Sequence, residues 1–163
     1  MDDVVLAHVN DDGVMPLRYR ACGLSNIILL SGYEIEEFDG EQHVAVKDAH
    51  DLHRAIGYVI ATKASSPSPE EMKFLREEMN LTQMELGLLL GLSSQAVARY
   101  EKGKVKVGGP AERLLRAIYM DHIDENVDIV DFVEALAELD ETPSDDISLT
   151  YDDGWSTREA AYG

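Results

Sequence analysis

The sequence predicts an α+β protein: a small N-terminal three-stranded antiparallel sheet with one helix, then an all-α domain of four to five helices, then an acidic C-terminal tail. Two patterns predict this class. Between residues 26 and 46, a short apolar run is followed by two segments that alternate apolar and polar side chains as half-buried strands do, and an Asp-Gly pair marks a tight turn. From residue 68 onward, apolar side chains recur with helical spacing behind clear helix start signals.

Length and composition allow one ordinary domain or two small ones, because the chain has 163 residues, of which 45% are apolar. No stretch approaches the roughly 18 consecutive apolar residues of a membrane span. The N-terminus lacks the basic-then-apolar layout of a secretory signal. The single cysteine, Cys22, excludes an internal disulfide framework. We therefore expect a cytoplasmic protein that does not associate with membranes.

We expect five segments along the chain, distinguished by their charge and apolar pattern. They are an acidic disordered leader (1–15), a small β-hairpin and helix domain (16–66), a helical domain (67–120), an amphipathic helix (121–140) and an acidic disordered tail (141–163). A turn-rich linker, Ala64–Pro69, marks the boundary between the two folded domains.

The net charge of -18 is distributed unevenly. Residues 1–67 carry 5 basic and 11 acidic side chains, residues 68–120 carry 8 and 7, and residues 121–163 carry 1 and 14. Between Ser94 and Arg116, six basic side chains accompany only two acidic ones. The acidic total argues against indiscriminate coating of nucleic acid, but a local basic surface lies in the helical domain.

In the first domain we expect strands near residues 26–30, 33–36 and 42–46, with a hairpin turn at Asp39-Gly40. Asp48 is placed to cap a helix that follows them. The apolar face of that helix, which we expect to cover the sheet, consists of Leu52, Ala55, Ile56, Val59 and Ile60.

The first domain does not have the spacing of a metal site. Cys22, His43, His50 and His53 are its soft and imidazole side chains, whereas a structural zinc site needs four ligands, usually in CxxC or HxxxH spacing. The chain also lacks a GxSxG, a Walker loop and an HExxH motif. We therefore expect no metal, no cofactor and no catalytic residue, and we expect that the protein is not an enzyme.

The helical domain carries three helix start signals. Ser68–Glu71 and Thr82–Glu85 are capping boxes, and Ser93 is a third N-cap residue. Gly91 ends the second helix and supplies the left-handed residue of a tight turn before the third. Two helices joined in this way, with a third before and a fourth after them, are typical of a helix-turn-helix.

The third helix of this domain (93–102) holds the candidate functional residues. When Val97 and Tyr100 face inward, its polar side chains face outward, and Gln and Arg can read adenine and guanine edges in the major groove. The candidate base-reading residues are Ser94, Gln95 and Arg99. The candidate phosphate-binding residues are Gln83, Ser93, Lys102, Lys104 and Lys106. The alternative is an ordinary four-helix bundle that does not bind DNA.

The central segment resembles the Cro/Xre-type, lambda-repressor-like helix-turn-helix family. The residues that carry the resemblance are Leu81-Thr82-Gln83, Glu85-Leu86, Gly91, Ser93, Val97 and Arg99–Gly103. The resemblance implies a sequence-specific transcriptional regulator, a repressor, that binds double-stranded DNA as a homodimer.

The Arg-Tyr-Glu-Lys-Gly ending of the third helix is also similar to that of the MqsA-type antitoxins. Those proteins place a zinc-binding domain before such a unit, and their DNA-reading amide and arginine fall on Gln95 and Arg99 here. Cys22-Gly23 is all that remains of the paired cysteines of the zinc motif, so zinc binding is not carried over.

A second hypothesis is an antitoxin-like or adaptor protein that binds a partner protein through residues 16–66 or the acidic tail and autoregulates its operon. The tail could instead compete with DNA phosphates for the basic helices, in which case its deletion raises non-specific DNA affinity. The helix 121–140 either packs on its own domain or forms a dimer contact. Its apolar stripe consists of Ile129, Phe132, Val133, Leu136 and Ala137.

Overall fold

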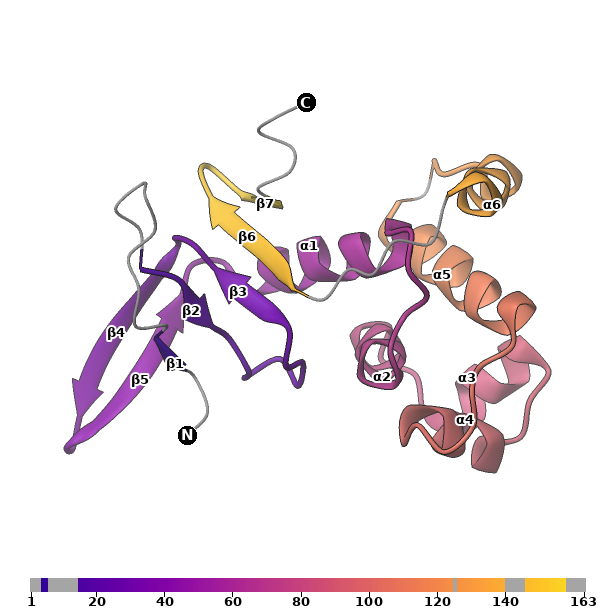
Figure 1. The fold of residues 1–163 in the computed structure, drawn as a ribbon, viewed down its shortest axis with the longest axis horizontal. Coiled ribbons are helices and arrows are strands. Elements are labelled where there is room, and N and C mark those ends of the chain that lie inside the picture. Colours follow the sequence, from indigo (N-terminus) through magenta and orange to yellow (C-terminus); the bar gives the residue numbers. More distant parts are fainter. Residues whose placement is uncertain (1–3, 6–14, 125, 140–145, 158–163) are drawn as a thin grey trace. The chain divides into compact units, whose positions relative to one another are not determined.

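A computed structural model of the protein describes residues 4–5, 15–124, 126–139 and 146–157. The α+β class is confirmed, since strands dominate the N-terminal part and helices follow (Figure 1). The chain divides into two compact units, unit 1 (residues 1–56 with 145–163) and unit 2 (residues 57–144). The division falls inside a helix, whereas the sequence predicts a boundary in the linker that follows. None of the described helices is long and apolar enough to cross a membrane.

Unit 1 contains a five-stranded sheet with the strand order β1-β2-β3-β6-β7. The strands are β1 (Val4–Val5), β2 (Leu17–Arg18), β3 (Ile27–Leu29), β6 (Ile147–Tyr151) and β7 (Trp155–Thr157). Neighbouring strands are antiparallel except β3 and β6, which are parallel. The register aligns Leu17 with Leu29 and Leu29 with Leu149. These three leucines are fully buried and form the centre of the sheet's core.

The prediction of a disordered tail was wrong for residues 147–157, which form β6 and β7. Ile147 and Leu149 alternate with more exposed residues and are buried, and so is Trp155. Burying these side chains stabilises the strands, and the acidic residues around them remain exposed to solvent. Apart from Asp146, which is exposed, the rest of the predicted tail lies outside the described residues. So does the leader, apart from Met15 and the pair Val4–Val5, which forms β1.

The three predicted strands exist, but they do not form one sheet. β4 (Tyr33–Phe38) and β5 (Glu41–Val46) form a separate antiparallel hairpin, whereas β3 lies in the five-stranded sheet. Gly32 lies between the two sheets with φ 76°, and a Cβ on it would lie 2.5 Å from Cβ of Tyr151. The predicted Asp39-Gly40 turn is confirmed, with φ of 52° and 77° at the two residues.

The helix α1 (Ala49–Thr62) confirms the predicted helix of the first domain. Its start is fixed as expected, because Oδ1 of Asp48 accepts a hydrogen bond from the Asp51 amide at 3.2 Å. Leu52, Ile56 and Ile60 are fully buried. The helix belongs to unit 1 up to Ile56 and to unit 2 beyond it.

Unit 2 consists of the end of α1 and five further helices. They are α2 (Pro69–Glu78), α3 (Gln83–Leu90), α4 (Ser94–Glu101), α5 (Gly109–Ile123) and α6 (Ile129–Glu138). Both predicted capping boxes are present, at Ser68 with Glu71 and at Thr82 with Glu85. The Ser93 side chain caps α4 by accepting a hydrogen bond from the Ala96 amide at 3.1 Å. These local signals therefore fix the start of three helices.

The segment predicted as one helix after residue 120 is divided. α5 continues to Ile123, and a polar turn separates it from α6. In this turn the Asn126 amide donates to Oδ1 of Asp124, and the Asp131 amide donates to Oδ1 of Asp128. Such short acidic side chains satisfy the free backbone amides at a helix start and so favour a break in the helix.

The apolar stripe of α6 packs on α5 within unit 2. Leu136 is buried, and Ile129, Phe132 and Val133 are half-buried, whereas Ala137 is exposed. The packing on its own unit therefore accounts for most of this stripe.

Candidate DNA-binding interface

The turn between α3 and α4 is compact because two glycines allow it. Gly91 ends α3 in the left-handed conformation, with φ 71°. The Leu92 amide donates to the Gly87 carbonyl at 2.8 Å, and a Cβ on Gly87 would lie 2.5 Å from the Leu92 carbonyl oxygen. α3 and α4 are thereby held in direct packing contact, with Leu86 and Val97 buried.

The outer face of α4 carries the predicted base-reading residues. Gln95 and Arg99 are exposed, and Ser94 is half-buried. Gln95, Arg99 and Lys102 are spaced by four and three residues, so they share one face of the helix. Val97 is fully buried as predicted, and Tyr100 is half-buried. This face therefore presents an amide, a guanidinium and an ammonium group to solvent.

The only carboxylate of α4 is held away from this face by an arginine of α2. Nη2 of Arg76 lies 2.7 Å from Oε1 of Glu101, and its Nε donates to the same carboxylate at 2.9 Å. Nη1 of Arg76 donates to the Leu81 carbonyl at 2.8 Å. Both side chains of the pair are nearly buried, at 11% and 4% exposure. From the sequence, Glu101 was one of the two acidic side chains between Ser94 and Arg116, and its pairing with Arg76 was missed, since no local spacing indicates a pair 25 residues apart.

The segment after α4 continues the positive charge. Gly103 ends the helix with φ 70°, and its amide and that of Lys104 donate to the carbonyls of Tyr100 and Arg99, both at 3.0 Å. Lys102, Lys104 and Lys106 are all exposed. The loop is therefore anchored to the C-terminal turn of α4, with lysines at alternate positions.

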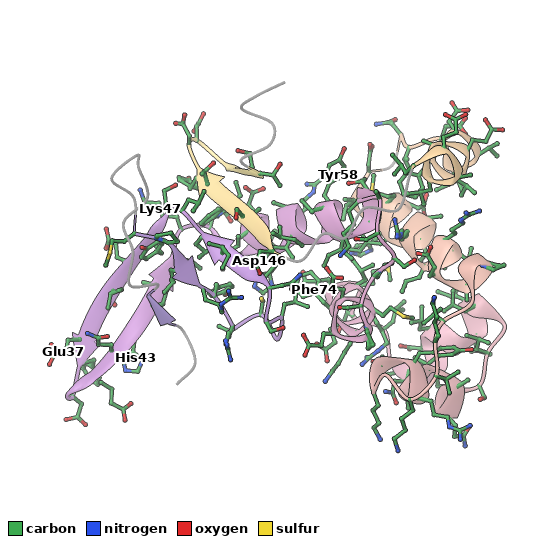
Figure 2. The ribbon with its side chains drawn as sticks, viewed as in Figure 1. Glu37, His43, Lys47, Tyr58, Phe74 and Asp146 are labelled. Atoms are coloured by element: carbon green, nitrogen blue, oxygen red, sulfur yellow. The ribbon has the colours of Figure 1, made fainter. Side chains whose placement is uncertain are left out.

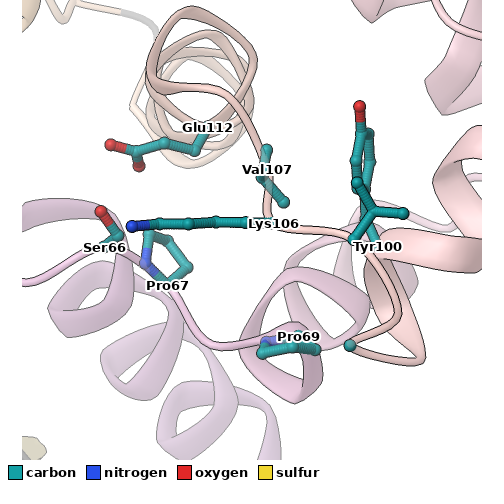
Figure 3. Close-up of a pocket in the computed structure, with 9 residues that line it drawn as sticks. Ser66, Pro67, Pro69, Tyr100, Lys106, Val107 and Glu112 are labelled. Carbon is teal, nitrogen blue, oxygen red and sulfur yellow. The ribbon is translucent and has the colours of Figure 1, made fainter.

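Lys106 is placed differently from the other two lysines. Its side chain extends along a cavity of about 280 Å³, toward Ser66 of the linker and below Glu112 of α5 (Figure 3). Pro67, Pro69 and Val107 provide apolar walls. The cavity is smaller than the roughly 300–1,000 Å³ of most small-molecule sites. We therefore regard it as the packing space of the Lys106 side chain rather than as a ligand site.

Buried ion pairs hold the linker against α2 and α5. Nζ of Lys63 donates to both oxygens of Glu71, at 2.6 and 2.8 Å, and Glu71 also caps the Ser68 amide. Arg116 donates to the carbonyls of Lys63 and Ser65 and lies 2.8 Å from the carboxylate of Glu112. Burial lowers the pKa of Arg116, and the charge of Glu112 opposes this shift. These residues position the frame around the interface, and sequence reasoning assigned a structural role only to Glu71 among them, as part of a capping box, and identified none of these ion pairs.

The candidate metal ligands considered for the first domain have other surroundings. Sγ of Cys22 lies 3.9 Å from the Tyr19 carbonyl, and the His53 ring lies 6.4 Å from the Tyr19 ring. Among the described residues, no group of three or more His, Cys, Asp or Glu side chains is placed to hold a metal ion.

The arrangement of α2, α3 and α4 is that of a helix-turn-helix, and the family match of this segment supports the class of DNA-binding helix-turn-helix regulators. Residues 72–110 match the family model HTH_3, described as Helix-turn-helix, of the Cro/C1 type. The match runs from α2 to the start of α5 and includes all the predicted DNA-contacting residues. No curated protein and no solved structure matches the chain. The predicted resemblance to the Cro/Xre-type helix-turn-helix is thus confirmed, and the similarity to the MqsA-type antitoxins is not shown.

Proposed function

We propose that the protein is a sequence-specific transcriptional repressor that inserts α4, with its caps Ser93 and Lys102, into the major groove of double-stranded DNA. The observation that carries this proposal is the composition of the exposed face of α4. Gln95 and Arg99 lie on it, and the nearby carboxylate of Glu101 is neutralised by Arg76. A negatively charged group on this face would repel the DNA phosphates.

The proposal assigns base reading to three residues. Arg99 donates to a guanine edge, and Gln95 forms paired hydrogen bonds with an adenine edge. Ser94, at the first position of α4, contacts a base close to the helix N-terminus. Its half-buried side chain is short, so it can reach only a base that approaches the helix closely.

Five residues form the proposed phosphate contacts. Gln83 and Ser93 lie at the N-terminal ends of α3 and α4, where free amides and the helix dipoles attract anions. Lys102, Lys104 and Lys106 extend the contact along the backbone of the DNA. Lys106 must leave its position near Ser66 to make this contact, so we expect it to contribute less than Lys104.

The proposal includes a homodimer on two half-sites. A single α4 contacts only a few base pairs, and two copies related by a two-fold axis double that number. The half-sites would lie about 34 Å apart, one turn of the DNA helix. A dimer on such a site covers the DNA and excludes other proteins from it, which is the simplest route to repression.

The first experiment is selection of bound duplexes from a random pool, followed by affinity measurements with variants. Arg99→Ala should cost about 1–3 kcal/mol on the selected duplex and relax the base preference at one position in each half-site. Lys104→Ala should weaken selected and random duplexes alike and reduce the salt dependence of binding by about one phosphate contact. If both variants lose the same affinity on both kinds of duplex, Arg99 does not read a base. If no sequence is enriched, the repressor proposal fails.

A second candidate function is an antitoxin-like or adaptor protein that binds a partner protein through unit 1 and uses the helix-turn-helix to regulate its own operon. The feature that favours it is the hairpin β4–β5, a separate sheet in the predicted partner-binding segment 16–66. DNA reading by α4 does not account for this hairpin. The two functions are compatible, because their proposed residues lie in different units.

A further inference from the structure

We propose that the hairpin β4–β5 is a docking arm for an extended, basic segment of another protein. The inference rests on the second candidate function, a protein partner for unit 1, and not on DNA reading.

The hairpin is a separate two-stranded sheet, and its outer end extends away from the other strands of unit 1 (Figure 1). Its six residue pairs, from Tyr33 with Val46 to Phe38 with Glu41, join β4 only to β5. The contacts that anchor it lie at its base, where the Tyr33 hydroxyl donates to the Met15 carbonyl and Lys47 lies 5.4 Å from the centre of the Tyr151 ring. Two-stranded hairpins are marginally stable alone. The outer part therefore gains stability when another chain packs on it.

The hairpin carries a concentrated negative charge. Five carboxylates lie between residues 33 and 46, and this stretch contains no Lys or Arg. They are Glu34, Glu36, Glu37, Asp39 and Glu41, all exposed. Within the described part of the chain, no basic side chain forms an ion pair with any of them. Figure 2 shows Glu37 and His43 in this outer part of the hairpin.

The two faces of the hairpin differ. Side chains alternate across a strand, and the register therefore places Glu34, Glu36 and Glu41 on one face. Phe38 lies on the same face beside Glu41 and is 75% exposed. The opposite face is more apolar and better covered, with Tyr33, Val44 and Val46 half-buried. The acidic face thus combines three unpaired carboxylates with an exposed aromatic ring.

An extended basic segment fits this surface in both charge and geometry. The outer edges of β4 and β5 pair with no other described strand, so their backbone groups can accept an added strand. Lys or Arg at alternate positions of that strand would lie about 7 Å apart, the spacing of same-face residues on β4. An apolar residue in the same series would cover Phe38. This complementarity favours a basic strand over an acidic or neutral one.

The probe for this proposal is a short labelled peptide in which Lys alternates with Val, titrated with the full-length protein and followed by fluorescence anisotropy. The triple variant Glu34→Gln, Glu36→Gln, Glu41→Gln should weaken binding about tenfold, the combined effect of three exposed ion pairs. The matched control neutralises three exposed acids of unit 2, Asp121→Asn, Glu134→Gln and Glu138→Gln, and should leave the Kd within about twofold. Equal losses in the two variants would show general charge attraction and overturn the docking arm.

A second variant separates the apolar contact from the charge. Phe38→Ser should weaken the peptide about threefold or more at both low and moderate salt, because an apolar contact is not screened by ions. If Phe38→Ser leaves the Kd unchanged, the Phe38 ring does not contact the peptide. If the triple variant also leaves the Kd unchanged, the proposal is wrong. Affinity for the selected duplex should be unaffected in every hairpin variant, so loss of DNA reading and loss of docking are measured independently.

The remaining outcome concerns a second copy of the chain. Its own basic segment after α4 is the other possible occupant, and sedimentation of the protein without peptide tests this. Self-association would have to disappear in two variants, the triple hairpin variant and the double variant Lys102→Ala, Lys104→Ala, to assign the arm to a second copy. That result would overturn the proposal that the arm binds a different protein. A protein whose association state is the same in all these variants supports the separate partner.

Discussion

At the scale of single residues, Arg76 neutralises the only carboxylate of α4, the helix that we propose reads DNA. Its guanidinium donates three hydrogen bonds to Glu101, from Nε and Nη2 to Oε1 at 2.9 and 2.7 Å and from Nε to Oε2 at 3.1 Å. It also donates to the Leu81 carbonyl. One side chain therefore connects α2, the loop before α3 and the end of α4. An unpaired Glu101 would lower stability, because its charge is buried. It would also place an uncompensated negative charge beside the basic segment.

We predict that Arg76→Met lowers the free energy of unfolding by about 3–5 kcal/mol, because it leaves the buried carboxylate of Glu101 without its partner. The second change, Glu101→Leu, should restore most of this loss in the double variant, since an apolar pair can replace a buried ion pair at little cost. Chemical denaturation of the two single variants and the double variant measures the coupling.

The control for this cycle is Lys73→Met, also on α2. Nζ of Lys73 lies 3.9 Å from Glu77, and both side chains are 54% exposed. This substitution should change stability by less than about 0.5 kcal/mol, because an exposed pair contributes little. Additive effects of Arg76→Met and Glu101→Leu would show that the pair does not stabilise the link between α2 and α4.

At the scale of elements, the joint between α3 and α4 depends on Gly87. Gly87 lies inside α3, where alanine normally stabilises a helix by about 0.5–1 kcal/mol relative to glycine. Here an added Cβ would lie 2.5 Å from a backbone oxygen, so the turn itself must move. The turn sets the angle at which α4 leaves α3, and under the proposed function this angle would determine how α4 fits the major groove.

We predict that Gly87→Ala reverses the usual sign and destabilises the protein by about 1–3 kcal/mol, because the clash is with backbone rather than with a flexible side chain. The affinity of Gly87→Ala for the selected duplex should fall by more than the affinity of Lys104→Ala falls for the same duplex. The control is Gly91→Asn, because asparagine tolerates the left-handed conformation and a Cβ at this position would meet open space. Thermal unfolding and anisotropy titrations measure both effects. A stabilising Gly87→Ala would show that α3 and α4 rearrange without loss.

Helices and strands differed in how far the sequence predicted them. The starts of α2, α3 and α4 were predictable because their caps are hydrogen bonds between residues three apart, such as Ser68 with Glu71. The pairing of β3 with β6 joins residues about 120 positions apart, and no local pattern encodes it. The strand β6 did have a local signal, since Ile147 and Leu149 alternate with polar residues. The acidic residues around it outweighed that signal in the sequence-based interpretation.

The candidate DNA interface was predictable as a set of residues but not as a charged surface. The positions of Gln95 and Arg99 follow from helical periodicity once Val97 faces inward. The neutralisation of Glu101 and the position of Lys106 along the linker depend on tertiary contacts. The size and the ranking of the lysine contributions to DNA affinity can therefore be predicted only from the folded structure.

At the scale of the whole molecule, the acidic C-terminal segment has a structural function. β6 lies between β3 and β7 in the five-stranded sheet, so deleting residues 141–163 would remove two strands and expose the leucine core. A change in non-specific DNA affinity after that deletion would not isolate the competition of acidic residues with phosphate. Substituting the exposed Asp152 and Asp153 by Asn tests that competition without removing a strand.

Trp155 provides the test of how far the two units depend on each other. Its ring packs edge-on against Tyr151 with centroids 5.4 Å apart, and its Nε1 donates to the Lys47 carbonyl at 2.7 Å. We predict that Trp155→Ala destabilises the sheet of unit 1 by about 3–5 kcal/mol, because it removes a large buried side chain. Ser156→Ala, at an exposed position of the same strand, should change stability by less than about 0.5 kcal/mol.

The decisive measurement for Trp155→Ala combines amide hydrogen exchange with DNA titration. Exchange should accelerate in β3, β6 and β7, while the amides of α3 and α4 keep their protection, because the caps, turn and ion pairs that order these helices all lie in unit 2. Affinity for the selected duplex should then stay within about twofold of the unsubstituted protein, below about 0.5 kcal/mol. A parallel loss of protection in α3 and α4, or a larger loss of affinity, would show that unit 2 needs the intact sheet to read DNA. Retained affinity would show instead that DNA reading is a property of unit 2 alone.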